Sequence, residues 1–398
     1  MKAGWQPKTL GEVYDVRDGT HDSPKYHTTG YPLITSKNLK RDGLSFDDVS
    51  LINEQDYKKI NERSAVHKGD VLLAMIGTIG NPTLVEVEPN FAIKNVALFK
   101  VPNGQSGAFL KHYLDSGWVS SKMMKEAKGT TQRFVGLGYL RDFPINIPSL
   151  PEQQRIVGIL DEALYGIATA KANAEQNLQN ARALFESHLQ SAFTQRGEGW
   201  VERELQDVVD ANCTLSYGIV QPGDEFPDGL PVIRPTDLTS KVISLNGLKR
   251  INPKLADSYK RTTLRGGELL LCVRGSTGVV SLASDELEGA NVTRGIVPIR
   301  FNSDLIIRDF AYYLMISEHV QQQIREKTYG AALMQINIGD LRKISAPYPP
   351  VSHQVTIAEK LGSLFAETQH LESIYQQKLS ALDALKKSLL DQAFTGVL

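Results

Sequence analysis

The sequence predicts an α/β (α+β) fold built as a two-copy internal repeat. Two globular domains are separated by two long antiparallel coiled-coil helices and related by pseudo-two-fold symmetry. Two observations lead to this prediction: five motifs recur in the same order, and each copy ends in a helical heptad pattern. A chain of 398 residues is long enough for two such domains, each with its own core.

The repeated motifs keep their order along the chain. WQPKTLGEV begins at Trp5 and its counterpart WVERELQDV at Trp200, an offset of 200 − 5 = 195. Four further pairs follow: GYPLITSKNL (30–39) with GLPVIRPTDL (229–238), KGDVLLAMIGTIG (68–80) with GGELLLCVRGSTG (266–278), FLKHYL (109–114) with DFAYYL (309–314), and SAFTQRG (191–197) with QAFTG (392–396). Chance could give one such pair but not five in order, so the chain is a duplication.

The repeat divides the chain into a globular segment 1–148, a helix 149–197, a second globular segment 198–348 and a second helix 349–398. KGDVLLAMIGTIG predicts a turn, a buried strand and a glycine turn, and FLKHYLDSGWVSSKMMKEA predicts one helix. A proline-rich run closes each globular segment, with Pro144, Pro148, Pro347, Pro349 and Pro350. Because proline cannot continue a strand or helix interior, we expect a stiff exit there.

Each predicted helix carries an apolar seam with steps of four and three residues, which is the heptad pattern of a coiled coil. The seam residues are Ile156, Leu160, Ala163, Ile167, Leu178 and Leu184 in the first helix, and Ile357, Leu361, Leu364, Leu371, Leu382 and Leu385 in the second. Both seams slip at one place, where Leu178 and Leu379 replace the expected Asn177 and Lys378.

A helix of roughly 45 residues is about 65 Å long at 1.5 Å per residue, and it needs a partner that buries its seam. The nearest partner is the other helix, and the globular segment between them lets the two run antiparallel. The alternative is that each helix packs back onto its own domain.

Composition excludes several classes of protein. The N-terminal residues have no apolar signal core, and the longest apolar runs, such as VLLAMI (71–76), are too short to span a membrane. Two cysteines, Cys213 and Cys272, give no disulfide framework, so we expect a cytoplasmic protein without a membrane partner. The net charge of −1 argues against a strongly basic nucleic-acid binder, although a local basic face would escape this argument.

No catalytic or metal-binding motif is present. GTIG (77–80) and GSTG (275–278) are too short for a dinucleotide fingerprint, there is no GxxxxGK[ST] or HExxH, and the histidines do not cluster at metal spacing. Asn81-Pro82 is followed by Thr83 and Leu84, which breaks the Asn-Pro-Pro-aromatic motif of amino-methyltransferases. A duplicated chain without a chemical motif is expected to bind or to organise partners rather than to catalyse.

Polar side chains do gather in predicted loops at equivalent places in the two copies. The first copy offers Thr35, Ser36, Lys37, Asn38, Thr78, Thr130, Thr131, Gln132 and Arg133, and the second offers Arg234, Thr236, Asp237, Arg274, Ser276, Thr277, Gln335 and Asn337. Arginine can read guanine, asparagine or glutamine can read adenine, and aspartate can accept from cytosine. Equivalent loops with different side chains suit two domains of one fold that read two DNA sequences, although ordinary loop polarity is the alternative.

The motif PSLPEQQRI (148–156), the seam that follows it, and the helix-ending SAFTQRG and QAFTG resemble the specificity subunit of type I restriction-modification systems. The resemblance covers essentially the whole chain, including the alternation of target-recognition domain and spacer helix. The second copy departs from the pattern, because PPVSHQVTI lacks the Glu-Gln-Gln run and keeps only Gln354 and Ile357.

The resemblance implies a non-catalytic DNA-binding subunit. Each recognition domain is expected to read one half of a bipartite site in double-stranded DNA through the major groove, while the helices set the unread gap and dock two modification subunits. Those partners would use S-adenosylmethionine to methylate adenine at N6, and restriction subunits would add ATP-dependent and Mg-dependent translocation and cleavage. This chain would then hold no cofactor itself.

Three alternatives remain open at this stage. A similar subunit could serve a fused nuclease-methyltransferase in a related split-site system. A coiled-coil scaffold could bind proteins through its two domains. An enzyme of unknown type is the third.

Overall fold

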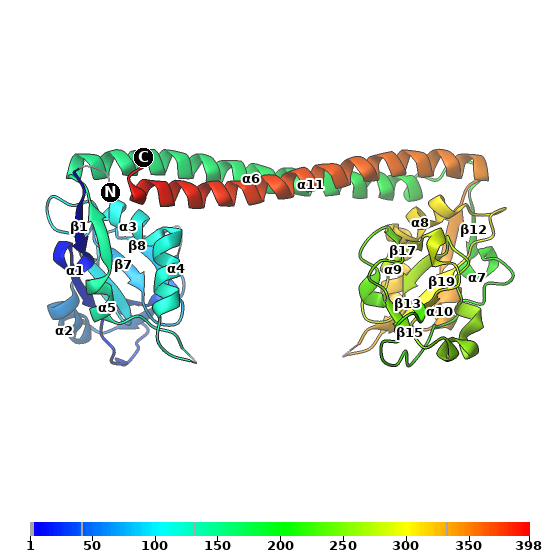
Figure 1. Cartoon of the computed structure of the whole chain (residues 1–398), viewed down its shortest axis with the longest axis horizontal. Coiled ribbons are helices and arrows are strands. Elements are labelled where there is room, and N and C mark those ends of the chain that lie inside the picture. The colour runs from blue at the N-terminus through cyan, green and yellow to red at the C-terminus, as the bar shows by residue number, and fades with distance from the viewer. Residues whose placement is uncertain (1–3, 41–42, 131, 332) are drawn as a thin grey trace. The chain divides into compact units, whose positions relative to one another are not determined.

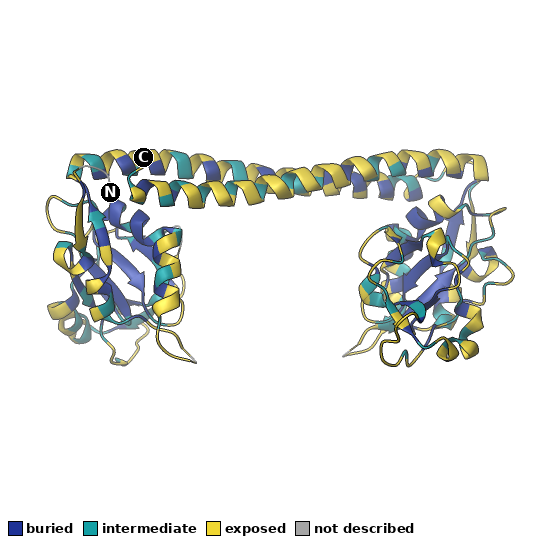
Figure 2. Cartoon of the chain, in the orientation of Figure 1, coloured by how far each residue is buried: buried dark blue, intermediate teal, exposed yellow. Residues whose placement is uncertain are grey.

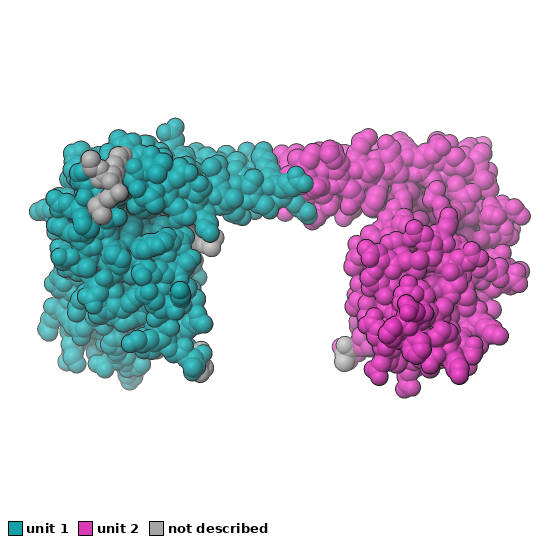
Figure 3. Space-filling model, viewed as in Figure 1, with its two compact units in different colours: residues 1–175, 376–398 teal, residues 176–375 magenta. Residues whose placement is uncertain are grey.

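The computed structural model describes residues 4–40, 43–130, 132–331 and 333–398. The chain divides into two compact units, residues 1–175 with 376–398 and residues 176–375 (Figure 3). Each unit combines one globular domain with part of both long helices, α6 (Leu150–Thr194) and α11 (Val351–Thr395).

The first unit is mixed α/β. Its strands are β1 (Gln6–Thr9), β2 (Asp15–Asp18), β3 (Tyr31–Ile34), β4 (Leu39–Lys40), β5 (Gly43–Leu44), β6 (Ser50–Ile52), β7 (Val71–Ala74), β8 (Gly80–Leu84), β9 (Ala92–Ile93), β10 (Val96–Lys100) and β11 (Pro144–Ile147). Its short helices are α1 (Leu10–Val13), η1 (Ser36–Asn38), α2 (Glu54–Ser64), α3 (Gly107–Asp115), α4 (Gly117–Glu126) and α5 (Leu137–Asp142).

The second unit repeats this plan. Its strands are β12 (Val201–Glu204), β13 (Leu230–Ile233), β14 (Val242–Ile243), β15 (Lys249–Ile251), β16 (Leu269–Cys272), β17 (Val280–Ala283), β18 (Asn291–Val292), β19 (Ile296–Ile299), β20 (Thr328–Tyr329), β21 (Gln335–Ile336) and β22 (Ser345–Tyr348). Its short helices are α7 (Leu205–Val208), η2 (Pro235–Asp237), η3 (Pro253–Thr262), η4 (Asp285–Leu287), α8 (Arg308–Ile316), α9 (Glu318–Lys327) and α10 (Ile338–Arg342).

Matching sheets confirm the duplication (Figure 1). Three antiparallel strands correspond, in the order β10-β7-β8 in the first unit and β19-β16-β17 in the second. The fourth strands of the two sheets lie at opposite edges, with β2 beside β10 and β14 parallel beside β17. A three-stranded sheet, β6-β3-β9 or β15-β13-β18, lies beside the four-stranded sheet with its last pair parallel. The predicted buried strand is also confirmed, because all four residues of β7 and of β16 are buried (Figure 2).

The helix predicted over residues 109–127 is two helices. Ser116 ends α3 in an extended conformation and begins α4, where its side chain accepts a hydrogen bond from the backbone N–H of Val119. A serine that bonds its own backbone competes with a continuous helix, and the following glycine weakens that helix further. Ser317 lies at the equivalent break between α8 and α9, so the helices match at an offset of 317 − 116 = 201, one residue more than the motif pair FLKHYL and DFAYYL gives.

Two of the five prolines at the domain exits lie within strands, contrary to expectation. Pro144 begins β11, which pairs with β1, and Pro347 lies inside β22, which pairs with β12. Both ladders have only two strands, so one edge needs no hydrogen-bond donor and tolerates proline. The stiff exit is therefore a two-stranded ladder that leads directly into each long helix.

One buried glutamine fixes the first turn of each long helix to its domain. Gln153 is fully buried, accepts a hydrogen bond of 2.9 Å from the backbone N–H of Ser106, and donates to Gln105 and to the carbonyl of Pro148, both at 2.9 Å. The glutamine that lies 201 residues further along the chain has the same role in the second unit. Gln354 accepts from the N–H of Ile307 and donates to the carbonyls of Leu305 and Pro349. This shared role explains why glutamine is kept in the second copy.

One ion pair joins α6 to α11 within each unit. Lys171 Nζ lies 2.6 Å from Asp383 Oδ1 in the first unit, and Arg182 Nε lies 3.0 Å from Glu372 Oε1 in the second. The paired numbers change in opposite directions, since 171 + 383 = 182 + 372 = 554, so the helices are antiparallel as predicted. At the 201-residue offset of the repeat, Lys171 corresponds to Glu372 and Arg182 to Asp383. The charges are therefore not repeated, because α6 supplies both cations and α11 both anions.

The predicted seam is followed only in part. Ile156, Leu160, Ile167 and Leu361 are buried, whereas Ala163, Leu178, Ile357, Leu364 and Leu382 are half-buried. Leu184, Leu371 and Leu385 are 50%, 39% and 47% exposed.

A different residue turns inward near Leu184. Phe185 packs edge-on against Phe365, with ring centroids 5.3 Å apart, and against Tyr313. A straight helix has 3.6 residues per turn and drifts away from a 3.5-residue repeat, so the inward position moves by one residue. Near their ends both helices also pack on the domains: Ile156, Leu160 and Leu390 belong to the core of the first unit.

Candidate nucleic-acid interface

The loop after β3 holds four of the candidate residues, and one of them is structural. The Asn38 side chain is 2% exposed, and its Oδ1 accepts from the backbone N–H and the hydroxyl of Thr35, each at 3.0 Å. Its amide donates to the carbonyls of Ser45 and Asp48. With all these bonds made, Asn38 shapes the loop, while Ser36 is only half-buried and Lys37 is exposed.

The equivalent loop after β13 uses a charged version of the same cap. Asp237 accepts from the backbone N–H of Arg234 at 2.7 Å and from its guanidinium at 3.1 Å and 2.8 Å. The hydrogen bond from Asp237 raises the pKa of Arg234 and keeps it charged. Thr236, between them, is exposed.

The turn after β7 is covered by a hairpin between α4 and α5. Lys128 and Phe134 exchange backbone hydrogen bonds of 2.9 and 2.8 Å, and the N–H of Gly77 donates to the carbonyl of Arg133 at 2.8 Å. Gly129 has φ +95°, and a Cβ there would lie 2.3 Å from the carbonyl oxygen of Gln132, so only glycine fits. In Figure 1 this hairpin extends past α4, at the end of the domain away from α6.

The candidate side chains of this region are exposed. Thr78 lies on the turn, Thr130, Gln132 and Arg133 lie on the hairpin, and Thr131 lies outside the described residues. Arg133 donates to the carbonyl of Met124 at 3.3 Å, which leaves the rest of its guanidinium accessible. Four hydrogen-bonding groups of the first unit therefore come together at one edge of the domain, which the turn after β7 and the hairpin between α4 and α5 form.

The second unit builds the same edge from β20, β21 and the turn after β16. Arg274 pairs with Gln335, and the N–H of Gly275 donates to the carbonyl of Met334 at 2.8 Å. The hydroxyl of Thr277 bonds that carbonyl at 3.3 Å, and Ser276 is exposed.

A short network ties the remaining two candidates to the hairpin. The amide of Gln335 donates to the Tyr329 hydroxyl at 3.2 Å, and this hydroxyl donates to Asn337 Oδ1 at 2.8 Å. Thus the turn and hairpin candidates of each unit lie together, with different side chains on the same backbone frame.

Sequence reasoning missed two features of this surface. The hairpins carry exposed apolar residues that could stack on or contact bases: Phe134, Tyr329, Leu333 and Met334. It also missed Arg294, which follows β18 and is exposed. The sequence does contain a signal for the first feature. Lys128-Gly129 and Tyr329-Gly330 begin equivalent hairpins, and Phe134, Leu333 and Met334 follow within five positions of the glycine.

A polar pocket of about 460 Å³ lies in the first unit between residues 19–24 and helix α2, and its lining includes Asp22, Asp56, Lys59 and Arg63. Buried Asp18 accepts from His21 Nε2 at 2.8 Å and from Arg63, and the other ring nitrogen of His21 faces Asn95 Oδ1 at 2.8 Å. Because both ring nitrogens face oxygen acceptors, the hydrogen bonds with Asn95 and Asp18 raise the pKa of His21. A positive His21 would favour a nearby phosphate.

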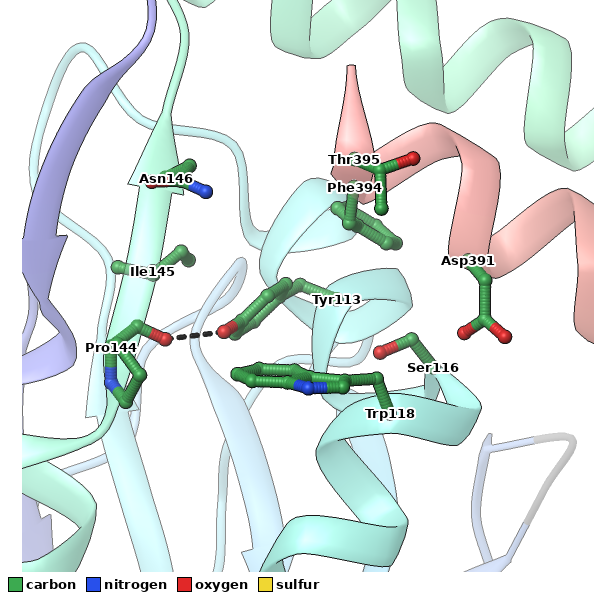
Figure 4. A pocket seen from close by; sticks show the side chains of 9 residues that line it. All are labelled: Tyr113, Ser116, Trp118, Pro144, Ile145, Asn146, Asp391, Phe394 and Thr395. Carbon is green, nitrogen blue, oxygen red and sulfur yellow. Dashed lines mark hydrogen bonds between the residues drawn. The ribbon is translucent and has the colours of Figure 1, made fainter. Parts of the chain in front are cut away.

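A separate apolar groove of about 540 Å³ lies where the end of α11 meets the first domain (Figure 4). The Tyr113 hydroxyl donates to the carbonyl of Pro144, and Trp118 is 51% exposed beside it. The remaining lining residues are Ser116, Ile145, Asn146, Asp391, Phe394 and Thr395. Such a groove suits a protein partner better than DNA, because apolar surface dominates it.

Neither a metal cluster nor a membrane segment emerges from the described ranges. No three His, Cys, Asp or Glu side chains there are grouped so that they could hold a metal ion. No helix among the described residues is long and apolar enough to cross a membrane.

Two copies of one domain, each with a polar loop-and-hairpin edge, define a duplicated sequence-recognition protein. The model of the family "Type I restriction modification DNA specificity domain" matches residues 2–179 and 197–380. The chain belongs to this family, and the double match agrees with the two units.

Relatives and solved structures agree with this assignment. The chain is 25% identical to the type I restriction enzyme EcoBI specificity subunit of Escherichia coli, over 95% of this chain and 85% of the relative. It is 21% identical to the type I restriction enzyme MjaVIII specificity subunit of Methanocaldococcus jannaschii, over 92% and 85%.

Two solved structures share the fold. The HsdS subunit from Thermoanaerobacter tengcongensis has a TM-score of 0.62 at 18% identity and covers 100% of this chain and 98% of its own. A chain from a study of complex assembly and conformational transition of the type I R-M system has a TM-score of 0.75 at 18% identity, over 99% and 98%.

Proposed function

We propose that this chain selects the DNA sequence on which a type I restriction-modification complex acts, and that each unit reads one half of a bipartite site. The observation that carries the proposal is the repeated edge with different side chains. Gln132 and Arg133 of the first unit are replaced by Leu333 and Met334 at the 201-residue offset, while both glycine turns keep their geometry. One frame with two different sets of side chains suits two different half-sites.

In this proposal the exposed loops enter the major groove, where each base pair presents a distinct pattern of donors and acceptors. The antiparallel helices α6 and α11 act as the spacer that sets the unread gap. Two readers on one face of B-DNA must be separated by about one helical turn, roughly 34 Å, or by a multiple of it.

We also propose that the helices and the groove at Trp118 dock two modification subunits and that restriction subunits join the assembly. Exposed apolar residues on the helices support such docking, notably Tyr165, which is 77% exposed, with Leu184 and Leu385. The subunit itself would be non-catalytic and cytoplasmic. The partners would bind S-adenosylmethionine, ATP and Mg, and would supply adenine-N6 methylation and ATP-dependent cleavage.

The proposal is tested by mapping N6-methyladenine across the genome in cells that express the modification subunits with and without this chain. We expect methylation at one split motif only when the chain is present. Unchanged methylation in the presence of active modification subunits would reject the proposal and favour a protein-binding scaffold. If methylation of the split motif required a single fused nuclease-methyltransferase, the chain would instead belong to the related split-site system.

Matched variants sharpen the test. Gln132→Ala should relax one half of the motif and Gln335→Ala the other, because each residue lies on the edge of a different unit. Gln154→Ala is the control, since Gln154 is exposed on α6 and far along the chain from both hairpins. Relaxation of the same half by both hairpin variants would contradict one reader per half-site.

A further inference from the structure

Two arginines of the second unit lie on adjoining loops at the end of a strand ladder. β16 pairs antiparallel with β19, and the N–H of Val273 continues the ladder by donating to the carbonyl of Gly295 at 2.8 Å. The ladder ends there, because the N–H of Ile296 donates to the carbonyl of Thr293 at 2.9 Å and closes a tight turn. Arg274 follows Val273 and Arg294 precedes Gly295, so the two arginines flank this contact.

Neither arginine has an acidic partner among the residues described. Arg274 is half-buried and its Nε is enclosed without a hydrogen-bond acceptor, while Arg294 is exposed. By contrast, Arg234 is held by Asp237, and Arg300 lies 3.2 Å from buried Glu268. An enclosed N–H without an acceptor is costly, so the position of Arg274 is not explained by hydrogen bonding within the unit. Both side chains therefore carry a positive charge that an acceptor from another molecule could meet.

The two arginines lie at the centre of the second unit's edge. Arg274 pairs with Gln335 of the hairpin, and a Cβ on Gly295 would lie 2.5 Å from Pro235 and 3.6 Å from the carbonyl oxygen of Arg274. The three loops that follow β13, β16 and β18 are therefore in contact, and both arginines lie on these loops together with Ser276 and Thr277.

The first unit differs at this place. Ile76 takes the place of Arg274 there, since it pairs with Phe134 of the hairpin. Asn95 takes the place of Arg294: its N–H donates to the carbonyl of Thr20 at 3.1 Å, as that of Arg294 donates to the carbonyl of Ile219 at 2.8 Å, and its side chain bonds His21. Two arginines at this place are thus a property of the second unit, as residues that set half-site identity would be.

We propose that Arg274 and Arg294 read guanine in the half-site bound by the second unit, a proposal that rests on the function proposed above. Guanine presents two acceptors, O6 and N7, in the major groove, and the planar guanidinium fork matches them in a bidentate contact. A DNA phosphate also offers paired acceptors. A phosphate contact carries no sequence information, so the two sources can be separated by experiment.

The test uses the full chain co-expressed with its modification subunits, with methylated adenines mapped by single-molecule sequencing. We expect the wild-type motif to contain at least one G·C pair in the second unit's half-site. Arg274→Ala or Arg294→Ala should lower the preference for that pair by about 10- to 100-fold and leave the other half-site unchanged. Arg274→Lys and Arg294→Lys keep the charge and lose the fork, so they should also relax the preference.

Arg203→Ala provides the control, because Arg203 is exposed like Arg294 but lies on β12, next to the long helices. A half-site without guanine would overturn the proposal. So would alanine variants that weaken methylation equally at all sequences, with a shallower salt dependence, and lysine variants that behave as wild type, because these results indicate a phosphate contact. If the wild-type complex methylates no split motif, the proposed function fails instead.

Discussion

Replacement of Gln153 by alanine should destabilise the first unit strongly, although the residue has no part in DNA contact. The change removes three hydrogen bonds and leaves the N–H of Ser106 and the carbonyl of Pro148 without their partner. A buried polar group that loses its partner costs about 1–3 kcal/mol. Two such groups, together with the cavity left by a fully buried side chain, give an expected loss of about 3–5 kcal/mol in the free energy of unfolding.

The assay is urea unfolding of the full chain, combined with hydrogen exchange at the backbone amide of Ser106. We expect faster exchange there and at the first turn of α6, and Gln354→Ala should do the same at Ile307 in the second unit. Gln154→Ala is the matched control, because its side chain is exposed one position further on and should change stability by less than about 0.5 kcal/mol. A Gln153→Ala loss as small as that of the control would refute the argument.

Three further predictions address the helix pair, a buried histidine and a hairpin. Lys171→Glu should cost about 0.5–1 kcal/mol of unfolding free energy by setting two acids together, and adding Asp383→Lys should recover it in a double-mutant cycle. Burial lowers the pKa of His112 below its ordinary value of 6.5. As the pH drops below about 6.5, the unfolded chain therefore binds a proton more readily than the folded chain, and the free energy of unfolding should fall. His112→Gln should flatten that slope in denaturant titrations at several pH values. Gly129→Ala should open its hairpin, because a Cβ would meet the carbonyl oxygen of Gln132 at 2.3 Å, and should weaken DNA binding together with amide protection of the hairpin.

Each of these predictions has a result that would count against it. Additive effects of Lys171→Glu and Asp383→Lys would mean that the ion pair contributes nothing. An unchanged pH slope after His112→Gln would place the titrating group elsewhere. Gly138→Ala is the control for the hairpin, since a Cβ there meets nothing within 4 Å, and equal protection in both glycine variants would remove the steric argument.

Repeat spacing and heptad periodicity were sufficient to predict the duplicated fold, because both are direct sequence signals. The details that failed depend on competition between neighbours. Phe185 displaces Leu184 from the inward position because helical drift and the adjacent Phe365 ring decide the packing. Ser116 ends a helix that the apolar pattern continues, because its hydroxyl offers the backbone another bond.

The candidate site was predicted at the level of loops rather than of side chains. Asn38 and Asp237 were selected because they are polar, yet both bond their own loop, which only the three-dimensional cap reveals. Arg294 has no local sequence signal, because the contact between Val273 and Gly295 that brings its loop beside Arg274 joins distant parts of the chain. Whether the remaining candidates contact bases stays a prediction.

Both cross-helix ion pairs have their cation on α6 and their anion on α11. This distribution has a consequence for how genes of this family can recombine. If two copies of α6 paired in the same antiparallel register, Lys171 would face Arg182 at both contacts, and two copies of α11 would set Glu372 against Asp383. Duplication of either half is therefore disfavoured, while one helix of each kind is favoured. New hybrids can exchange their recognition loops and still pair correctly, provided that positions 171, 182, 372 and 383 keep their charges.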